Sequence, residues 1–563
     1  MTFHIEKINL NDIDQIEVEL NALKDEPINS AVELKNWLIK QTELYDSIDE
    51  SLMGHYIQFQ CFSTDEKVKK AVEHDQQKVQ PMLKRYKYLL DLKFIQSPFV
   101  SELDSAYYSR LIKFKENAMR LYNEENIELE IEEDRLVTKY FELTGSLTIQ
   151  WDGEEITINQ VRQYFEDSNR DIRKKAMTLM YEAFASIESE LQKILSELIQ
   201  IRDKKAKNSG FANFRDYMFA KYERFDYTPE DCKQLAESVS KYVVPFAGEL
   251  EQEHKREINV EDYCPWDRRA VPTGQERLKP FEKTEELIDG TTTIFNQMEP
   301  EFASLLKNMD EKGSLDLGSR KGKSQGGFCE YLPVSKMSFI FMNAAKSHDD
   351  VITLLHEMGH CIHDHLKKGI PLSKYREIPM ESAELASMSM EMLTMDYWNV
   401  FYENEEDLLR AKRDQFKGVV GLVPYGMLID QFQHWLYENP HHTIAERKEK
   451  FKELHKRFDG GQVNWDSYEK WIEDQWLIVL HIFEVPFYFI EYVIAQLGAV
   501  QMLMQYKDNP IQTLENYKKA LSLGGTKSLP EVYETAGIRF DFSQDMIQTL
   551  MDFTRNELAQ LKN

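Results

Sequence analysis

The segment that begins at Val351, VITLLHEMGHCIHDHL, constrains the possible folds more than any other part of the chain. Its apolar residues recur every three to four positions, as in a helix with one buried side: Val351, Leu354, Leu355, Met358 and Ile362. We expect Asp349 or Asp350 to cap the start of this helix. A fold that contains the segment must bury one face of the helix against other elements.

The same segment carries a His-Glu-x-x-His motif. Residues four apart lie one turn above each other on a helix, so His356 and His360 point the same way and could bind one cation. Glu357 is offset by about 100° and could reach a water molecule on that cation without binding the cation itself. Two imidazoles and a carboxylate favour Zn²⁺, although Mn²⁺ or Co²⁺ could substitute.

A catalytic zinc ion needs a third protein ligand, and a second helical pattern after Pro379 offers candidates. The acidic residues available there are Glu377, Glu381, Glu384 and Glu391. Glu384 and Glu391 are seven residues apart and share a helix face, so they could act as ligand and supporting partner. Periodicity alone does not choose between Glu381 and Glu384, and we expect Glu377 to be solvated.

Most of the remaining chain has helical spacing, for example around Leu83 to Leu90 and from Phe184 to Ile201, where Gly210 marks a stop just beyond. Two regions differ. The sequence LTIQWDGEEITI, residues 147–158, alternates around Asp-Gly and predicts a β-hairpin. The sequence GKSQGGFCEYLPVSKMSFIFMN from Gly322 predicts one or two strands, including residues 337–341.

Composition excludes several classes of function. With 97 acidic against 69 basic residues the formal charge is −28, which disfavours nucleic acid and anionic membranes as partners. The five cysteines are scattered without a CxxC pair, as is typical of a reducing compartment. The first twenty residues lack an apolar signal region, and the most apolar stretch, residues 476–490, is too short to span a bilayer. We therefore expect a soluble cytoplasmic protein.

Three segments together resemble one protein family. They are HEMGHCIH at 356–363 followed by ESAELASMSMEML from Glu381, HIFEVPFYFIEYVIAQLGA from His481, and LSLGGTKSLPEVYETAGI from Leu521. This combination is similar to the thimet oligopeptidase and oligoendopeptidase F family of zinc metallopeptidases, and the oligoendopeptidase F branch fits best. The likeness runs from about residue 200 to the end and is weaker before that.

The resemblance assigns roles to particular positions. It implies that His356, His360 and Glu384 bind one zinc ion per chain and that Glu357 is the general base. Glu384 is selected over Glu381 because the family's ligand has another glutamate seven residues downstream, here Glu391. The family uses a histidine and tyrosines to stabilise the oxyanion, and the groups available here are His481, Tyr488 and Tyr492.

The resemblance also implies a fold. We expect a mainly α protein, a large helical ellipsoid with an internal substrate channel and a zincin-type active site with a small β-sheet beside the HExxH helix. An N-terminal helical lobe would cover residues 1–200, including the hairpin, and the catalytic region residues 201–563. Such a channel would admit short unfolded peptides and exclude folded proteins.

The expected function is a zinc-dependent endopeptidase that hydrolyses short oligopeptides by Glu357-assisted attack of a zinc-bound water. The strand at 337–341 could pair with an extended substrate. Two alternatives stay open: a non-catalytic, zinc-containing helical scaffold that binds peptides, and an aminopeptidase on the same core. His363 could support the metal site or lie in the core. We expect ordinary core or surface positions for five other histidines: His365, His434, His441, His442 and His455.

Overall fold

Helices form most of the chain, as its apolar spacing predicts, and the strands are short. The computed structural model describes residues 8–324 and 326–561. The chain divides into two compact units that alternate along the sequence. Unit 1 comprises Met1–Tyr122, Leu278–Lys412 and Ala495–Phe540, and unit 2 comprises Asn123–Arg277, Arg413–Ile494 and Asp541–Asn563.

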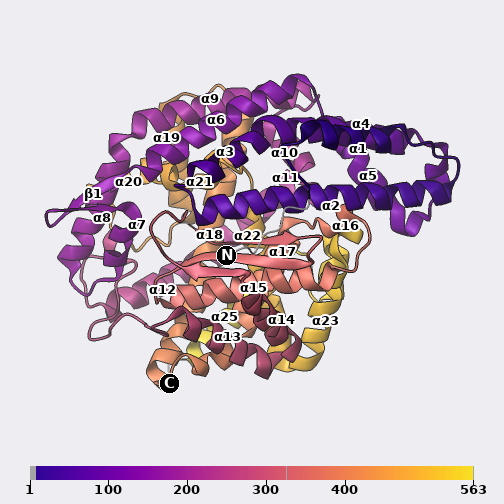
Figure 1. Ribbon diagram of the computed structural model, residues 1–563. Helices are drawn as coiled ribbons and strands as arrows, with labels where there is room; N and C mark the ends of the chain where they lie inside the picture. Colours follow the sequence, from indigo (N-terminus) through magenta and orange to yellow (C-terminus); the bar gives the residue numbers. More distant parts are fainter. Residues whose placement is uncertain (1–7, 325, 562–563) are drawn as a thin grey trace. The chain divides into compact units, whose positions relative to one another are not determined.

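Unit 1 contains the metal-motif helix and a three-stranded sheet (Figure 1). Its helices are α1 (Ile13–Asp25), α2 (Ala31–Cys61), α3 (Glu66–His74), α4 (Gln80–Gln96), α5 (Ser105–Leu121), α13 (Thr284–Met298), α14 (Pro300–Glu311), α15 (His348–Lys367), α16 (Ser373–Arg376), α17 (Met380–Leu393), α23 (Pro510–Ser522) and α24 (Leu529–Thr535). Short 3₁₀ or π segments join some of them: η1 (Asp75–Val79), η2 (Pro98–Glu102), η5 (Met395–Val400) and η7 (Gly524–Thr526).

Unit 2 is helical apart from one hairpin. Its helices are α6 (Glu125–Gly145), α7 (Ile158–Arg162), α8 (Arg170–Ser186), α9 (Glu188–Asn208), α10 (Phe214–Lys221), α11 (Pro229–Tyr242), α12 (Val244–Glu257), α19 (Ile444–Phe458), α20 (Glu469–Asp474), α21 (Leu480–Phe483) and α25 (Gln544–Gln560), with 3₁₀ segments η3 (Gln163–Glu166), η4 (Pro265–Asp267) and η6 (Gln475–Ile478). The chain passes from one unit to the other within α18 (Glu405–Glu438) and within α22 (Phe489–Asp508).

The sheet of unit 1 consists of β3 (Leu315–Gly318), β4 (Phe328–Leu332) and β5 (Met337–Ala344) in the order β3-β5-β4. The central strand, β5, runs antiparallel to β4 and parallel to β3. We expected one or two strands after Gly322, and the structure has two, β4 and β5. The sequence analysis did not predict β3, which is only four residues long.

Two helices cover opposite faces of this sheet (Figure 1). Phe339 and Phe341 of β5 pack with Ile57 and Cys61 of α2. Ser338 points the other way, as alternate side chains in a strand do, and its hydroxyl donates to Asp364 Oδ2 of α15 at 2.8 Å. The sheet thus forms a support beneath the helix that carries the His-Glu-x-x-His motif.

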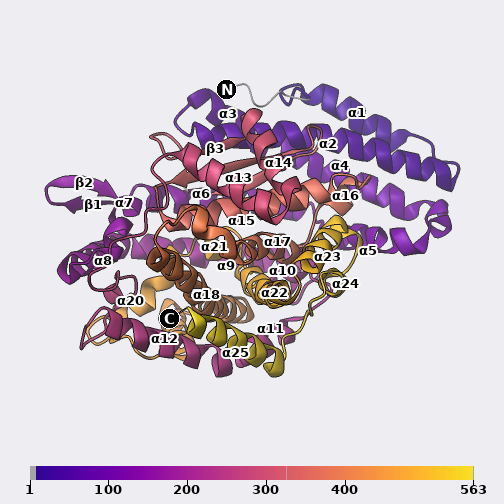
Figure 2. The same ribbon diagram turned by 90° about the horizontal axis from the view of Figure 1, so that it is seen from below.

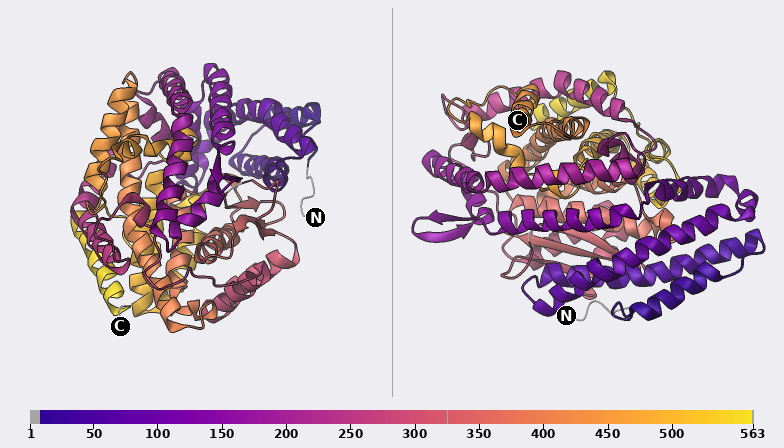
Figure 3. Two further views of the ribbon diagram at one scale, coloured as in Figure 1. Left: turned by 90° about the vertical axis from the view of Figure 1, so that its left-hand side faces the viewer. Right: turned by 90° about the horizontal axis from the view of Figure 1, so that it is seen from above.

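The predicted hairpin is present in unit 2. Strand β1 (Thr148–Trp151) pairs antiparallel with β2 (Glu154–Thr157), and both turn residues, Asp152 and Gly153, have positive φ. The right panel of Figure 3 shows the hairpin extending beyond the end of α6. A two-residue turn with positive φ at both positions requires residues such as Asp and Gly, which explains why the sequence signal was readable.

Two details of the helices differ from expectation. The pattern from Phe184 to Ile201 is not one helix, because α8 ends at Ser186 and α9 begins at Glu188, with Ile187 between them. The helix after Lys346 begins earlier than expected, since Ser347 is the N-cap and Asp350 is its capping-box partner. The division into lobes at residue 200, the ellipsoid and the channel stay predictions.

Candidate metal centre on helices α15 and α17

Helix α15 is held firmly at its start and along one side. Ser347 Oγ accepts from the Asp350 N–H, and Asp350 Oδ2 accepts from the N–H groups of Ala345 and Ser347. The five residues of the predicted apolar stripe are all buried. Two fixed features, the cap and the stripe, therefore determine which way His356, Glu357 and His360 point.

Helix α17 approaches α15 at a glycine, and Figure 2 shows the two helices side by side. A Cβ atom built on Gly359 would lie 2.3 Å from Ser387 Cα and 2.7 Å from the Ala386 carbonyl oxygen. Both are backbone atoms, which a change of rotamer cannot move away. The absence of a side chain at Gly359 is what lets the two backbones come this close.

This approach brings His356, His360 and Glu384 together, with one ligand atom of each within 4.8 Å of the others. His356 Nε2 lies 3.4 Å from Glu384 Oε2. Ligand atoms held about 2.0–2.1 Å from a tetrahedral zinc ion lie about 3.3–3.4 Å from each other, so the donor set and its spacing fit that ion. The grouping contains Glu384 and not Glu381. Glu381 instead acts on Tyr533, because burial and the charge of Glu381 together raise the pKa of that tyrosine. Glu377 is exposed beside Lys374, as expected.

The two histidines have different electrostatic surroundings. Burial lowers the pKa of His360 to about 4, which keeps its imidazole neutral and able to ligate. Burial acts in the same direction on His356, but hydrogen bonds and charges from Glu384 and Glu391 raise its pKa well above the ordinary value. Glu384 and Glu391 give the surroundings of His356 an excess of negative charge, which attracts cations.

Glu357 lies between the histidines in sequence and points elsewhere. Its carboxyl group is buried, and Oε2 has no hydrogen-bond partner among the described residues. Burial raises the pKa of Glu357 to about 7. Gly327, from the glycine pair before β4, passes beside it, since a Cβ there would lie 3.7 Å from Glu357 Oε1. A carboxylate in such surroundings is suited to exchange a proton near neutral pH.

The residues expected to stabilise an oxyanion lie in unit 2 and are grouped there. The ring centroid of His481 is 5.9 Å from those of Tyr488 and Tyr492, and the two tyrosine rings are 5.2 Å apart. They come from α21, the start of α22 and the turn between them. Phe489 packs edge-on against His481.

Two buried arginines anchor this segment, and the sequence analysis did not identify them. Arg224 Nη2 donates to the Phe487 carbonyl at 2.6 Å and to Glu491 Oε1 at 2.7 Å. Arg202 donates to the carbonyls of Ile482 and Phe483. Phe487 itself has positive φ and is fully buried. No sequence signal pointed to the arginines, because their backbone and side-chain partners are distant in the chain.

His363 faces away from the metal-ligand group. It is buried and lies near the backbone of Leu521, and burial lowers its pKa well below the ordinary value. Of the two roles open to it, the structure favours the core position, between α15 and α23.

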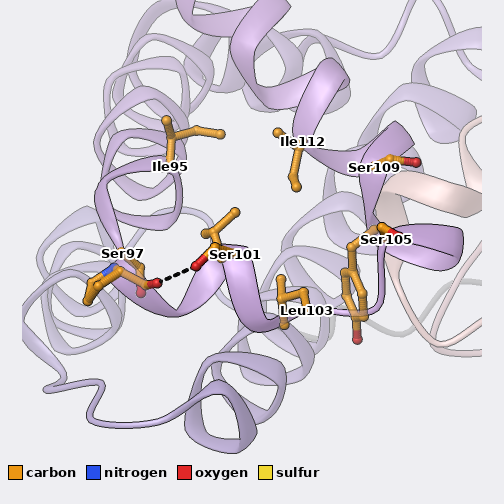
Figure 4. A pocket seen from close by; sticks show the side chains of 10 residues that line it. Ile95, Ser97, Ser101, Leu103, Ser105, Ser109 and Ile112 are labelled. Atoms are coloured by element: carbon orange, nitrogen blue, oxygen red, sulfur yellow. Dashed lines mark hydrogen bonds between the residues drawn. The ribbon is translucent and has the colours of Figure 1, made fainter.

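A separate pocket of about 520 Å³ lies in unit 1 between α4, η2 and α5 (Figure 4). Its walls are apolar or carry hydroxyl groups: Ile95, Ser97, Pro98, Val100, Ser101, Leu103, Ser105, Tyr108, Ser109 and Ile112. It has no carboxylate, imidazole or thiol, so it lacks the groups needed for hydrolysis.

A His-Glu-x-x-His helix with a glutamate supplied by a second helix is a zincin-type site in a mainly helical fold. The family model "Peptidase family M3" matches residues 163–552, and the model "Peptidase M3 N-terminal domain" matches residues 3–122. The chain therefore belongs to peptidase family M3, as the motifs led us to expect.

Known proteins agree with this assignment. The structure described as "PZ peptidase A with inhibitor 2" is 26% identical, with a TM-score of 0.92 over 100% of this chain and 99% of that one. Oligopeptidase PepF of Bacillus subtilis (strain 168) is 22% identical over 69% of this chain and 57% of its own length. An oligoendopeptidase F homolog of Lactococcus lactis subsp. lactis (strain IL1403) is 21% identical over 72% and 66%. The chain thus spans less than two thirds of the length of these two relatives.

The described helices include no candidate for a membrane-spanning segment. Within the part of the chain that the structure describes, no helix combines the length and the apolarity that crossing a bilayer requires.

Proposed function

We propose that the chain is a zinc-dependent endopeptidase that hydrolyses short unfolded oligopeptides. The observation that carries the proposal is the grouping of His356, His360 and Glu384 beside a buried carboxylate, Glu357, with an unpaired oxygen. Membership of peptidase family M3 and the names of the oligopeptidase relatives support the reaction and the substrate class. The limit to short peptides rests on the family resemblance.

One zinc ion per chain would be held by His356 Nε2, His360 and Glu384. When bound, the ion would supply a Lewis acid that polarises the scissile carbonyl and lowers the pKa of water. Glu391 fixes the tautomer of His356, because a carboxylate 2.7 Å from Nδ1 keeps the proton on that nitrogen and leaves Nε2 as the donor to metal.

Glu357 acts as the general base. It is not one of the three grouped ligand residues, and its raised pKa suits a group that takes a proton from the attacking water and returns it to the leaving amine. His481, Tyr488 and Tyr492 donate hydrogen bonds to the oxyanion, each contributing about 3–4 kcal/mol at most. Their mutual grouping and the family resemblance support this role.

Recognition of the substrate backbone involves β4 rather than β5. We expected the strand at 337–341 to pair with an extended peptide, and this expectation is wrong, because β5 is the central strand and pairs on both sides. Among the described strands of this sheet, β3 and β4 each pair on one side only, and β4 is the one preceded by Gly327, which passes beside Glu357. The outer edge of β4 therefore offers main-chain groups to an extended peptide.

The chain works in a reducing compartment such as the cytoplasm, and nucleic acid and membranes are not its partners. The five cysteines are scattered without a CxxC pair, and the formal charge of −28 repels polyanions.

An internally quenched peptide blocked at both ends tests the proposal. We expect the zinc-loaded protein to cleave it and a chelator to abolish cleavage, with recovery when zinc is restored. Cleavage only after the amino end is freed would indicate an aminopeptidase. Binding of the peptide without cleavage, with zinc bound, would indicate a scaffold.

A further inference from the structure

A second group of metal-binding side chains lies in unit 2, within the protein interior. Cys232 on α11 and Asp430 and His434 on α18 each place a ligand atom within 4.8 Å of the other two. Their exposed fractions are 0%, 0% and 2%. We call these three residues the Cys232 cluster.

One distance within the cluster equals one within the group of His356, His360 and Glu384, which we call the family metal site. Asp430 and His434 are four residues apart on one helix, so their side chains lie one above the other. His434 Nε2 is 3.4 Å from Asp430 Oδ2, the same distance that separates His356 Nε2 from Glu384 Oε2. This is the distance of about 3.3–3.4 Å expected between nitrogen and oxygen ligands of a tetrahedral zinc ion.

The polar atoms of Asp430 and His434 are poorly satisfied by the described protein groups. Neither ring nitrogen of His434 makes a hydrogen bond, and Asp430 Oδ1 has no partner, among the residues that the structure describes. Asp430 Oδ2 accepts from Gln431 Nε2 at 3.0 Å. A buried polar atom without a partner is destabilising, so three such atoms in one place point to a bound group that satisfies them.

The walls of the cluster do not supply that partner. The rings of Phe219 and Phe487 pack edge-on against His434, with centroids 6.1 and 5.4 Å away. Arg224 lies over the Phe219 ring, but its guanidinium pairs with Glu491 at 2.7 Å, and both residues are buried. The charge of Arg224 is thus paired with Glu491 and not with Asp430.

We propose that Cys232, Asp430 and His434 bind a structural metal ion and that Zn²⁺ is the ion they favour. A thiolate and a carboxylate offset the charge of a divalent ion in a site where burial would otherwise exclude it. Sulfur, nitrogen and oxygen donors together are typical zinc ligands, and a water molecule completes the tetrahedron. The ion joins α11 to α18 within unit 2.

Metal content separates this site from the family site. In the full-length double variant His356→Ala/His360→Ala, which lacks two donors of the family site, we expect one zinc equivalent after dialysis, against two in the wild type. Chelation of that remaining ion should lower the melting temperature. A double variant that is folded and metal-free would overturn the proposal, whatever the peptidase assay shows.

Cobalt substitution gives a second readout that requires no variant of the cluster. The donors of the family site are nitrogen and oxygen, so a thiolate-to-cobalt charge-transfer band reports only a cysteine ligand. We expect wild-type protein loaded with Co²⁺ to show this band. Its absence at full cobalt loading would contradict the proposal even if every cluster variant failed to fold.

A matched pair of substitutions identifies the cysteine. Cys232→Ser should remove the sulfur band and one metal equivalent. Cys264→Ser alters another buried thiol of unit 2, whose Sγ lies 3.3 Å from Asp262 Oδ2, and should change neither. A band that survives Cys232→Ser, or that disappears in Cys264→Ser, would show that the assignment is wrong.

Discussion

His356 Nδ1 lies 2.7 Å from Oε1 of Glu391, which is on α17, seven residues after the candidate ligand Glu384. The other ring nitrogen, Nε2, is left facing Glu384 at 3.4 Å. His356 therefore lies between two carboxylates, and each of them faces a different nitrogen of its ring. We propose that Glu384 completes the ligand set and that Glu391 holds the imidazole in the tautomer that can ligate.

This division of tasks predicts a graded loss of zinc affinity. Glu384→Gln should weaken binding most, because it removes an anionic ligand atom. Glu391→Gln should cost about 10–100-fold, as losses of a supporting partner typically do. Glu381→Gln, on the same helix but outside the ligand group, serves as the control and should bind zinc normally. Zinc titration of the three variants would contradict the assignment if Glu381→Gln lost metal and Glu384→Gln kept it.

Gly359 should tolerate no side chain. Gly359→Ala improves intrinsic helix propensity by about 1 kcal/mol, yet its Cβ would lie 2.3 Å from Ser387 Cα. We expect α17 to move from α15, with a lower melting temperature and weaker zinc binding. Gly418→Ala is the matched control, since Gly418 is exposed on α18 with nothing within 4 Å of its Cβ position. If the two variants had the same melting temperature and the same zinc affinity, Gly359 would not be needed for the close approach of the helices.

Arg224 should matter for turnover more than for metal content. Arg224→Lys keeps the charge but replaces the rigid guanidinium, whose Nη2 donates to both the Phe487 carbonyl and Glu491, with a shorter and flexible ammonium group. We expect kcat to fall by about ten- to a hundredfold, because Tyr488 would be misplaced, while KM changes less and zinc content stays constant. Arg135→Lys, which alters an exposed pair with Glu132, is the control. Normal kcat in Arg224→Lys would exclude this positioning role.

Glu133 should contribute stability that acid removes. Burial alone would raise the pKa of Glu133, but Arg202 and Lys205 hold it at about 2. A carboxyl group whose folded pKa lies below its unfolded value stabilises the fold above about pH 4.5, and this contribution is lost as the pH falls toward 2. Glu133→Gln should therefore destabilise the protein most above pH 5 and progressively less toward pH 3.

Urea unfolding at several pH values measures this difference. The exposed pair of Glu132 with Arg135 offers the control Glu132→Gln, which should cost at most about 1 kcal/mol at any pH. A penalty for Glu133→Gln that stays constant from pH 7 to pH 3 would show that the low pKa is not the source of its effect.

Local geometry explains which parts of the site could be predicted from the sequence. The relation of His356, Glu357 and His360 depends only on helical periodicity, and the structure has them on one helix. Choosing Glu384 over Glu381 required the family resemblance, because the choice depends on how α17 lies on α15, which Gly359 determines through contacts distant in the sequence.

Elements that depend on tertiary contacts were predicted less well. The apolar period continues through Ile187, yet the helix breaks there, since burial can continue across a change of direction. The strand β5 was expected, but its central place follows from β3, which is too short to show an alternating pattern. His434 has the spacing of an ordinary core histidine, and its nearness to Cys232 depends on how α11 and α18 pack.

We propose that Glu357 is a base and not a metal ligand, and the variant Glu357→Gln separates the two roles. Cleavage of the end-blocked peptide and zinc content should be measured on the same preparation, beside wild-type protein. We predict an unchanged zinc content with turnover reduced by about 10²–10⁴-fold. Near-normal turnover, or loss of zinc together with activity, would show that Glu357 is not the base.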